Sequence, residues 1–165
     1  MDDHSIHLLF SANRWEISGG IEEDIAHGVS VIVDRYSYSG AVYSAAKANP
    51  SLSLQWAWQP EIGLPSPDLC IFLSTSAEDA AKRGGFGAER YETGTMQSRV
   101  HELFRSMFNQ HSRSVHVQII DAGRPMSEVS QDIQAAASDC IKTLEAIGPL
   151  KKLGPLLTSP TVSKE

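Results

Sequence analysis

Three short apolar runs interrupt a chain that otherwise favours helices. Residues 29–34, 69–74 and 115–120 are rich in Val, Ile, Leu and Phe, and each run predicts a buried strand. Apolar residues in the longer segments between them recur at helical spacing. Strands that are apolar throughout and alternate with helices are typical of a parallel sheet covered on both faces. The pattern therefore predicts an α/β fold.

The predicted helices fill most of the remaining sequence. They span residues 3–15, 21–27, 37–48, 52–58, 76–83, 93–110 and 127–146. The Ser-Gly-Gly at 18–20 is expected to separate the first two helices, and Gly28 to end the second. Ser76 is a predicted N-cap, with Asp79 at the reciprocal position. The clearest apolar stripe belongs to the helix at 93–110 and consists of Met96, Val100, Leu103, Phe104, Met107 and Phe108.

Length and composition indicate one ordinary globular domain. The chain has 165 residues, of which 41% are hydrophobic and 21% charged. We expect the domain to span residues 1–147, and residues 148–165, rich in Pro, Ser and Lys, to form a largely unpacked tail. No apolar segment approaches the roughly 20 residues of a membrane helix. The opening residues lack the pattern of a signal peptide.

Charge and metal-ligating residues exclude two further classes of function. The net charge of −6 argues against a general nucleic-acid surface, which needs a basic face. Two cysteines lie far apart in the sequence and predict free thiols in a reducing compartment. The six histidines are scattered, and no Cys/His spacing suggests zinc.

Candidate chemistry gathers at the ends of the predicted strands. Ligands of parallel α/β folds bind beyond the carboxyl ends of the strands. The residues that follow the three runs are Asp34 and Arg35, Ser74 and Thr75, and Asp121 and Ala122. A carboxylate such as Asp34 can hold Mg²⁺ through water, and the planar guanidinium of Arg35 suits a phosphate. The alternative is an ion pair between these strand-end charges and a neighbouring helix.

Two further groups of residues are compatible with a nucleotide. Phe10 and Arg14 lie one helical turn apart, which suits stacking on a planar heterocycle and hydrogen bonding to its exocyclic oxygen. Alternatively, Phe10 packs inward and Arg14 extends to solvent. Residues 81–92 surround a glycine-rich centre with Lys82, Arg83 and Arg90, a composition that fits a lid over polyphosphate or a solvated basic loop.

Four motifs together resemble one family. "LLFSANRWE", "DRYSYSG", "GLPSPDL" and "AAKRGGFGAERYE", in that order, are similar to thymidylate kinase of the eukaryotic type. The resemblance runs from about Asp3 to Ile147. It implies a P-loop NTPase-like parallel sheet with helices on both faces. It also implies transfer of the γ-phosphoryl group of ATP, with Mg²⁺, to dTMP, giving dTDP for dTTP biosynthesis.

The resemblance implies a dTMP site built from residues of the first two motifs. Phe10 would stack on thymine, and Arg14 would hydrogen-bond a base carbonyl. Arg35 would bind the dTMP phosphate as a catalytic residue. Asp34, also catalytic, would organise the phosphate-binding arginine and contact the metal indirectly, through water.

Other dTMP contacts are implied for residues further along the chain. Ser39 and Gly40 would line the base pocket. Tyr43 would pack near the sugar, where its bulk would disfavour a 2′-hydroxyl. Tyr91 and Gln97 would close over the acceptor nucleotide.

The ATP side of the site is implied by the lid and by the third strand. Arg83 and Arg90 would be catalytic lid cations that face ATP. Asp121, Ala122 and Arg124 belong to "DAGR", where the family has its adenine-binding loop.

The sequence lacks one motif that the family uses for ATP. No G-x-x-x-x-G-K-[ST] segment occurs in the 165 residues. We therefore expect an amino-terminally truncated member of the family. Its sheet would lack the first, central strand, which in the family lies between the strands that match 29–34 and 69–74.

Two other functions stay open. One is a non-catalytic dTMP-binding or interaction protein, which keeps the pocket of Phe10, Arg14, Arg35 and Gly40. The other is a kinase for uridylate or guanylate, which the joint occurrence of "FSANRWE" and "DRYSYSG" disfavours. The resemblance also implies a homodimer. The net charge and the lack of a membrane-length apolar segment argue against a nucleic-acid or membrane partner. The expected location is the cytoplasm, with the nucleus as a second candidate compartment.

Overall fold

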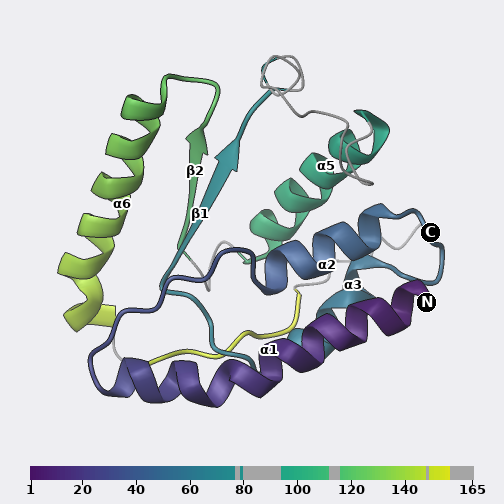
Figure 1. Ribbon diagram of the computed structural model, residues 1–165, viewed down its shortest axis with the longest axis horizontal. Coiled ribbons are helices and arrows are strands. Elements are labelled where there is room, and N and C mark those ends of the chain that lie inside the picture. Colours follow the sequence, from purple (N-terminus) through teal and green to yellow (C-terminus); the bar gives the residue numbers. More distant parts are fainter. Residues whose placement is uncertain (77–78, 80–93, 112–115, 148, 157–165) are drawn as a thin grey trace, which may run out of the picture.

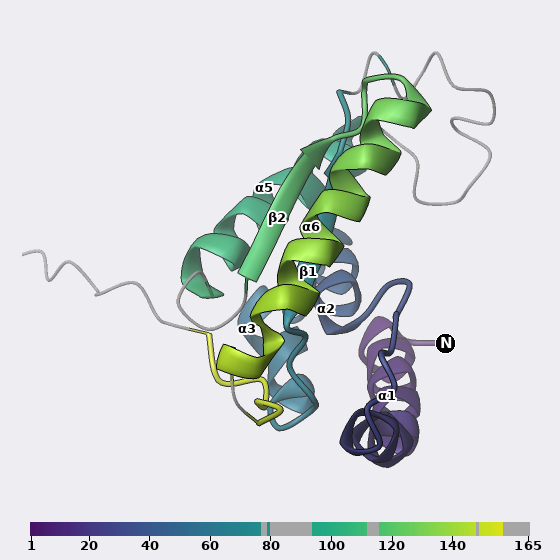
Figure 2. The ribbon, with the colours of Figure 1, turned by 90° about the vertical axis from the view of Figure 1, so that its left-hand side faces the viewer.

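Two parallel strands form the centre of the fold (Figure 1). The structure is a computed structural model that describes residues 1–76, 79, 94–111, 116–147 and 149–156. Strand β1 (Leu69–Ser74) pairs in parallel with β2 (His116–Asp121), from Leu69 opposite His116 to Ser74 opposite Asp121. Helices α5 (Gly94–His111) and α6 (Met126–Ile147) cover opposite faces of this pair (Figure 2). The predicted α/β layering is confirmed.

A hydrophobic core that contains several aromatic rings joins the sheet to the shorter helices. Helix α2 (Ser37–Ala46) packs on α3 (Leu54–Trp58) and on α5. The fully buried Trp58 lies beside Tyr38, with 5.3 Å between the ring centroids, and Phe72 of β1 lies 4.6 Å from the ring of Phe104. Buried aromatic pairs at these separations contribute about 0.5–1.5 kcal/mol beyond the area they bury.

Most of the predicted elements are confirmed to within two residues at each end. The agreement covers α2, α3, β1, α5, β2 and α6. Sequence reasoning missed one short element, the 3-10 helix η1 (Gln59–Glu61). The predicted cap is also present, because Ser76 Oγ accepts a hydrogen bond of 3.0 Å from the Asp79 amide and contacts the Asp79 carboxylate at 2.7 Å. The rest of the predicted helix at 76–83 lies outside the described residues.

Helix α1 (Asp3–Ala26) is one element, so the predicted break at 18–20 is wrong. Asp2 caps its first turn, and the helix ends before Gly28, whose φ of +79° suits glycine as expected. A glycine inside a helix destabilises it by only about 1 kcal/mol relative to alanine. The contact of Trp15 Nε1 with the Pro60 carbonyl, at 2.6 Å, anchors the helix just before the glycines. This anchor holds α1 on η1 immediately before the weak segment.

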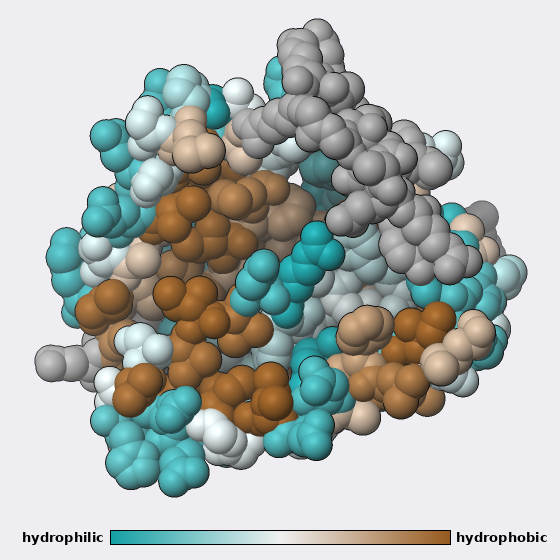
Figure 3. All heavy atoms as spheres, viewed as in Figure 1, coloured by the Kyte–Doolittle hydropathy of each residue, from teal (hydrophilic) through white to brown (hydrophobic). Residues whose placement is uncertain are grey.

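Residues 29–34 do not form a strand, so the buried strand predicted there from the sequence is wrong. A strand is stabilised by a hydrogen-bonded ladder, and β1 makes its ladder with β2 rather than with this segment. The apolar side chains of the segment are accordingly exposed, with Ile32 at 97%. Figure 3 shows that apolar side chains also reach the surface over the sheet and along α1, where the exposed residues include Leu73, Ile119, Leu9 and Phe10.

The segment after Gly148 is packed where the structure describes it. Leu153 and Leu156 are buried, and Leu153 exchanges backbone hydrogen bonds with Gly63 and Leu64 at 2.9 and 2.8 Å. Trp58 Nε1 donates to the Gly154 carbonyl at 2.8 Å. The prediction of an unpacked tail is therefore wrong for residues 149–156, because they pack against the core beside Trp58. Residues 157–165 lie outside the described part of the chain.

We predict that Leu153→Ala destabilises the protein by about 2–5 kcal/mol, because it leaves a cavity in this part of the core. Lys151→Ala, two residues earlier and exposed, should change the free energy of unfolding by less than about 0.5 kcal/mol. Urea denaturation of both variants measures the difference. Equal stabilities would mean that residues 149–156 do not pack on the core.

Candidate functional site

A buried carboxylate organises the part of α1 that carries Arg14. Glu61, at the end of η1, is fully buried. Arg14 Nε donates to its Oε2 at 2.7 Å, and Arg14 Nη2 donates to its Oε1 at 2.6 Å. Such a bidentate, charge-assisted pair fixes the plane of the guanidinium. Arg14 Nη1 donates to no other residue of the described segments, so its two N–H groups can serve a ligand.

Gly40 of α2 lies against this guanidinium. A Cβ at position 40 would lie 2.8 Å from Arg14 Nη2 and 3.1 Å from both Cζ and Nη1. Atoms essentially never approach a Cβ that closely, so only glycine lets the guanidinium lie against α2. Two residues of different predicted motifs, Arg14 and Gly40, are thereby in direct contact.

A second buried side chain continues the network behind Glu61. His7 lies on the same face of α1 as Arg14, and its Nδ1 shares a hydrogen bond of 2.9 Å with Ser44 Oγ of α2. Burial lowers the pKa of His7 below its usual value, against the attraction of Glu61, whose Oε1 is 3.9 Å from His7 Nε2. The imidazole is therefore neutral at pH 7. Sequence reasoning missed Glu61, His7 and Ser44; the i, i+7 spacing of His7 and Arg14 was the available signal.

Phe10 and Arg14 are arranged in the opposite way to the alternative in which Phe10 packs inward and Arg14 extends to solvent. Phe10 is 62% exposed, whereas the side chain of Arg14 is only 11% exposed. Phe10 contributes to a shallow apolar hollow of about 380 Å³ along α1, lined also by Met1, Ile6, Leu9 and Asn13. An exposed aromatic ring thus lies one turn before a fixed guanidinium, on the same side of one helix.

Arg35 and Tyr43 are also brought together. The Cζ atom of Arg35 lies 5.9 Å from the centroid of the Tyr43 ring. Arg35 has a φ of +62°, a conformation that is strained for a residue with a side chain by about 1–3 kcal/mol. Asp34 is exposed, and no ion pair joins either charge to another residue within the described segments, so their pairing with a neighbouring helix is not seen. Ser39 lies half-buried in the first turn of α2.

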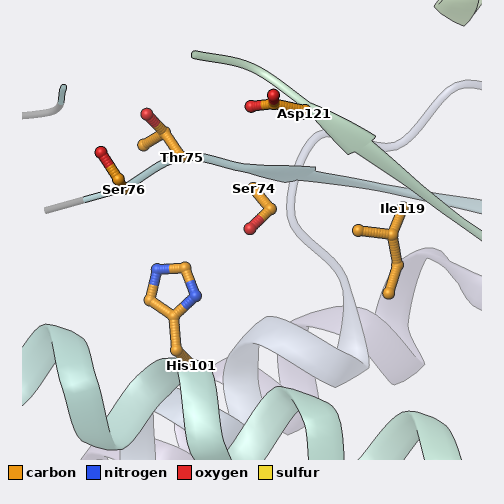
Figure 4. Close-up of a pocket in the computed structure, with 6 residues that line it drawn as sticks. All are labelled: Ser74, Thr75, Ser76, His101, Ile119 and Asp121. Atoms are coloured by element: carbon orange, nitrogen blue, oxygen red, sulfur yellow. The ribbon is translucent and has the colours of Figure 1, made fainter.

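A separate cavity of about 430 Å³ lies at the carboxyl ends of the strands (Figure 4). Its lining comes from β1, the two residues that follow it, β2 and α5, and consists of Ser74, Thr75, Ser76, His101, Ile119 and Asp121. Thr75 Oγ1 is buried without a hydrogen-bond partner among the described residues. The segment that joins α1 to α2 passes the amino ends of the strands (Figures 1 and 2) and is not part of this lining.

The residues predicted to contact ATP lie at this edge of the sheet, but their polar groups interact with other groups of the protein. The Ala122 amide donates to the Ser74 carbonyl at 2.7 Å, and Asp121 Oδ1 accepts from the Gly123 amide at 2.8 Å. Arg124 contacts Asp132 and Glu128 of α6, and the hydrogen bond with Asp132 raises its pKa. Carboxylates of α6 thus hold the Arg124 side chain.

Three of the predicted lid residues, Arg83, Arg90 and Tyr91, lie outside the described residues. Gln97, on α5, is half-buried. Both cysteines are free, as expected, and burial raises the pKa of Cys70 to about 11. Within the described segments, no helix is long and apolar enough to cross a membrane.

We predict that Gly40→Ala destabilises the protein by about 1–3 kcal/mol, because its methyl group displaces a guanidinium that Glu61 holds in place. Gly20→Ala is the matched control: it lies inside α1 with nothing within 4 Å of its added methyl group. This control should stabilise the protein by about 0.5–1 kcal/mol. Thermal unfolding of both variants measures the effects, and a stabilising Gly40→Ala would show that Arg14 is not held against α2.

Comparison with known proteins gives a consistent result. The family model for thymidylate kinase matches residues 1–133. The chain is 44% identical over 143 residues to a thymidylate kinase of Homo sapiens and 40% identical over 145 residues to one of Danio rerio. These alignments cover 87% and 88% of the chain, which spans 66% of the length of each relative.

The fold agrees with this sequence similarity. The solved structure of thymidylate kinase from Candida albicans superimposes with a TM-score of 0.73 at 29% identity, covering 93% of this chain and 74% of the other. A parallel α/β core of the P-loop NTPase type, four motifs in the expected order and relatives at 40% and 44% identity thus agree. The chain belongs to the thymidylate kinase family.

Proposed function

We propose that this protein acts as a thymidylate kinase, which transfers the γ-phosphoryl group of ATP to dTMP to give dTDP for dTTP synthesis. The family membership supports this proposal. The observation that carries it for this chain is the state of Arg14, which is charge-paired with the buried Glu61 and still has the N–H groups of Nη1 available. A fixed donor edge of this kind can recognise the carbonyl of a flat base.

The neighbouring residues suit the other parts of the acceptor. Phe10, exposed one turn before Arg14, offers a ring on which thymine would stack. Ser39 would line the base pocket beside Gly40, whose lack of a side chain admits the Arg14 guanidinium. Tyr43, which lies under Arg35, would pack near the sugar and disfavour a 2′-hydroxyl.

Arg35 would bind the dTMP phosphate. Its guanidinium matches a phosphate in shape and charge, and its strained backbone is of the kind that clusters at ligand sites. Asp34 would contact Mg²⁺ through water. A single exposed carboxylate fits this ion, which keeps several waters and is held largely by nucleotide phosphates. When bound, the ion would neutralise charge on the transferring phosphoryl group.

The donor side is proposed from the sequence motifs. Arg83 and Arg90 would close over ATP as lid cations, and Tyr91 and Gln97 would close over the acceptor. Asp121, Ala122 and Arg124 would lie at the adenine, although Arg124 would first have to leave its contacts with α6. Phosphoryl transfer depends mainly on aligning the two nucleotides and neutralising charge, which these residues would provide.

Calorimetry with dTMP and with ATP–Mg²⁺ tests the proposal. We expect dTMP to bind and Arg35→Ala to weaken its binding about 10- to 100-fold, because a charge-assisted hydrogen bond contributes about 1.5–3 kcal/mol. Thymidine, which lacks the phosphate, should bind the wild-type protein and Arg35→Ala with equal affinity. Arg105→Ala, an exposed arginine on α5, is the matched control and should leave dTMP affinity unchanged.

The outcomes separate the candidate functions. Formation of dTDP from dTMP and ATP supports the kinase. Binding of dTMP with no binding of ATP and no turnover would instead support a non-catalytic dTMP-binding protein. A protein that binds neither nucleotide, or whose dTMP affinity is indifferent to Arg35, would contradict the proposed site.

A homodimer located in the cytoplasm and the nucleus, with no nucleic-acid or membrane partner, completes the proposal. Leu9 and Ile17 are exposed on the same side of α1 and would supply an apolar surface for pairing. Helix α2 is largely buried against α1, α3 and α5 and offers less surface for pairing. Light scattering that shows a monomer would contradict the dimer.

A further inference from the structure

We propose that Glu61 is a positioning residue for base recognition: it fixes the guanidinium of Arg14 so that only the Nη1 edge faces the acceptor base. This inference rests on the proposed function, since it concerns the same dTMP site. Glu61 itself does not touch the nucleotide. It acts through Arg14, and no motif of the sequence assigned it a role.

The hydrogen bonds of Arg14 determine which donors remain. Nε and one N–H of Nη2 are directed at Glu61, at 2.7 and 2.6 Å. The plane of the guanidinium lies against Gly40, so the side chain cannot rotate toward α2. The edge that carries Nη1 is therefore the one presented away from Glu61.

The position of Glu61 is itself fixed by α1. The carbonyl of Pro60, the preceding residue, accepts hydrogen bonds from Ser11 Oγ at 3.2 Å and from Trp15 Nε1 at 2.6 Å. Ser11, Arg14 and Trp15 thus bind two adjacent residues of η1 from a single turn of helix. The carboxylate and the arginine that it orients are held on the same support.

Burial makes this arrangement persistent. Glu61 has no exposed surface, so its charge depends on Arg14 for compensation. His7 lies 3.9 Å away, too far for a hydrogen bond, and its pKa is lowered by burial. Because release of Arg14 would leave a buried carboxylate unpaired, the donor edge is set before the ligand arrives, which reduces the ordering needed on binding.

Substitution by glutamine separates positioning from packing. Glu61→Gln keeps the size of the side chain, but its amide nitrogen would confront one guanidinium N–H, donor against donor. The guanidinium would turn to avoid this contact, and Nη1 would leave its position. Recognition of the base would suffer, whereas the phosphate contact of Arg35, on another segment, would not.

The test compares dTMP with 2-deoxyribose 5-phosphate, which lacks the base, as ligands of the full chain in calorimetry and ligand-observed NMR. For Glu61→Gln we expect a loss of about tenfold or more in dTMP affinity, the effect of a lost charge-assisted hydrogen bond. The affinity for 2-deoxyribose 5-phosphate should change by less than about twofold, because the phosphate contact is unchanged. Glu102→Gln, an exposed carboxylate on α5, is the matched control and should change neither affinity.

A double-mutant cycle completes the test. In an Arg14→Met background, Glu61→Gln should cause no further loss of dTMP affinity, because the residue through which it acts is gone. If Glu61→Gln does not fold, Glu61→Asp retains the charge and should show a smaller, still dTMP-selective loss.

The results distinguish this inference from the proposed function. Equal losses for dTMP and 2-deoxyribose 5-phosphate would show that Glu61 only maintains the structure and would overturn the inference. If the wild-type protein binds dTMP and Glu61→Gln binds it equally well, the inference is overturned and the proposed function is not. A wild-type protein that binds no dTMP would overturn both.

Discussion

The pairing of one buried carboxylate with one arginine underlies the whole candidate site. Glu61 is removed from water, and an ion of this kind loses several kcal/mol of solvation that only a well-formed partner offsets. Arg14 supplies two hydrogen bonds, and the absence of a side chain at Gly40 gives the guanidinium room. Helices α1 and α2 and the turn η1 must therefore meet in one arrangement. Breaking such a pair typically destabilises a protein by about 3–5 kcal/mol.

The core was largely predictable from the sequence because its signals are local. The runs at 69–74 and 115–120 are apolar throughout, and they pair with each other in the sheet. The run at 29–34 carries the same signal but has no ladder partner in the described segments, since pairing is a property of the neighbours and not of the run. Residues 149–156 show the converse case: a segment rich in turn-forming residues packs on the core through Leu153 and Leu156, because Trp58 and Leu64 meet it from far away in the chain.

The site was predictable as motifs and less so as geometry. Phe10 and Arg14 were selected by type and spacing and Gly40 by the family resemblance, but which of these residues would be buried was not predicted. A helical spacing does not say which of two neighbours faces inward, and Arg14 is buried because Glu61, distant in sequence, lies opposite it. Glu61 itself belongs to a short 3-10 helix with no periodic pattern. A residue that works by orienting another is found only once the chain is folded.

A structure of the protein with bound dTMP tests the central claim most directly. We predict that Arg14 keeps both hydrogen bonds to Glu61 while Nη1 donates to a thymine carbonyl at about 2.7–3.2 Å. We also predict that the phosphate lies at Arg35. Thymine bound elsewhere, for example in the cavity at the carboxyl ends of β1 and β2, or an Arg14 that leaves Glu61 to reach the base, would contradict the claim.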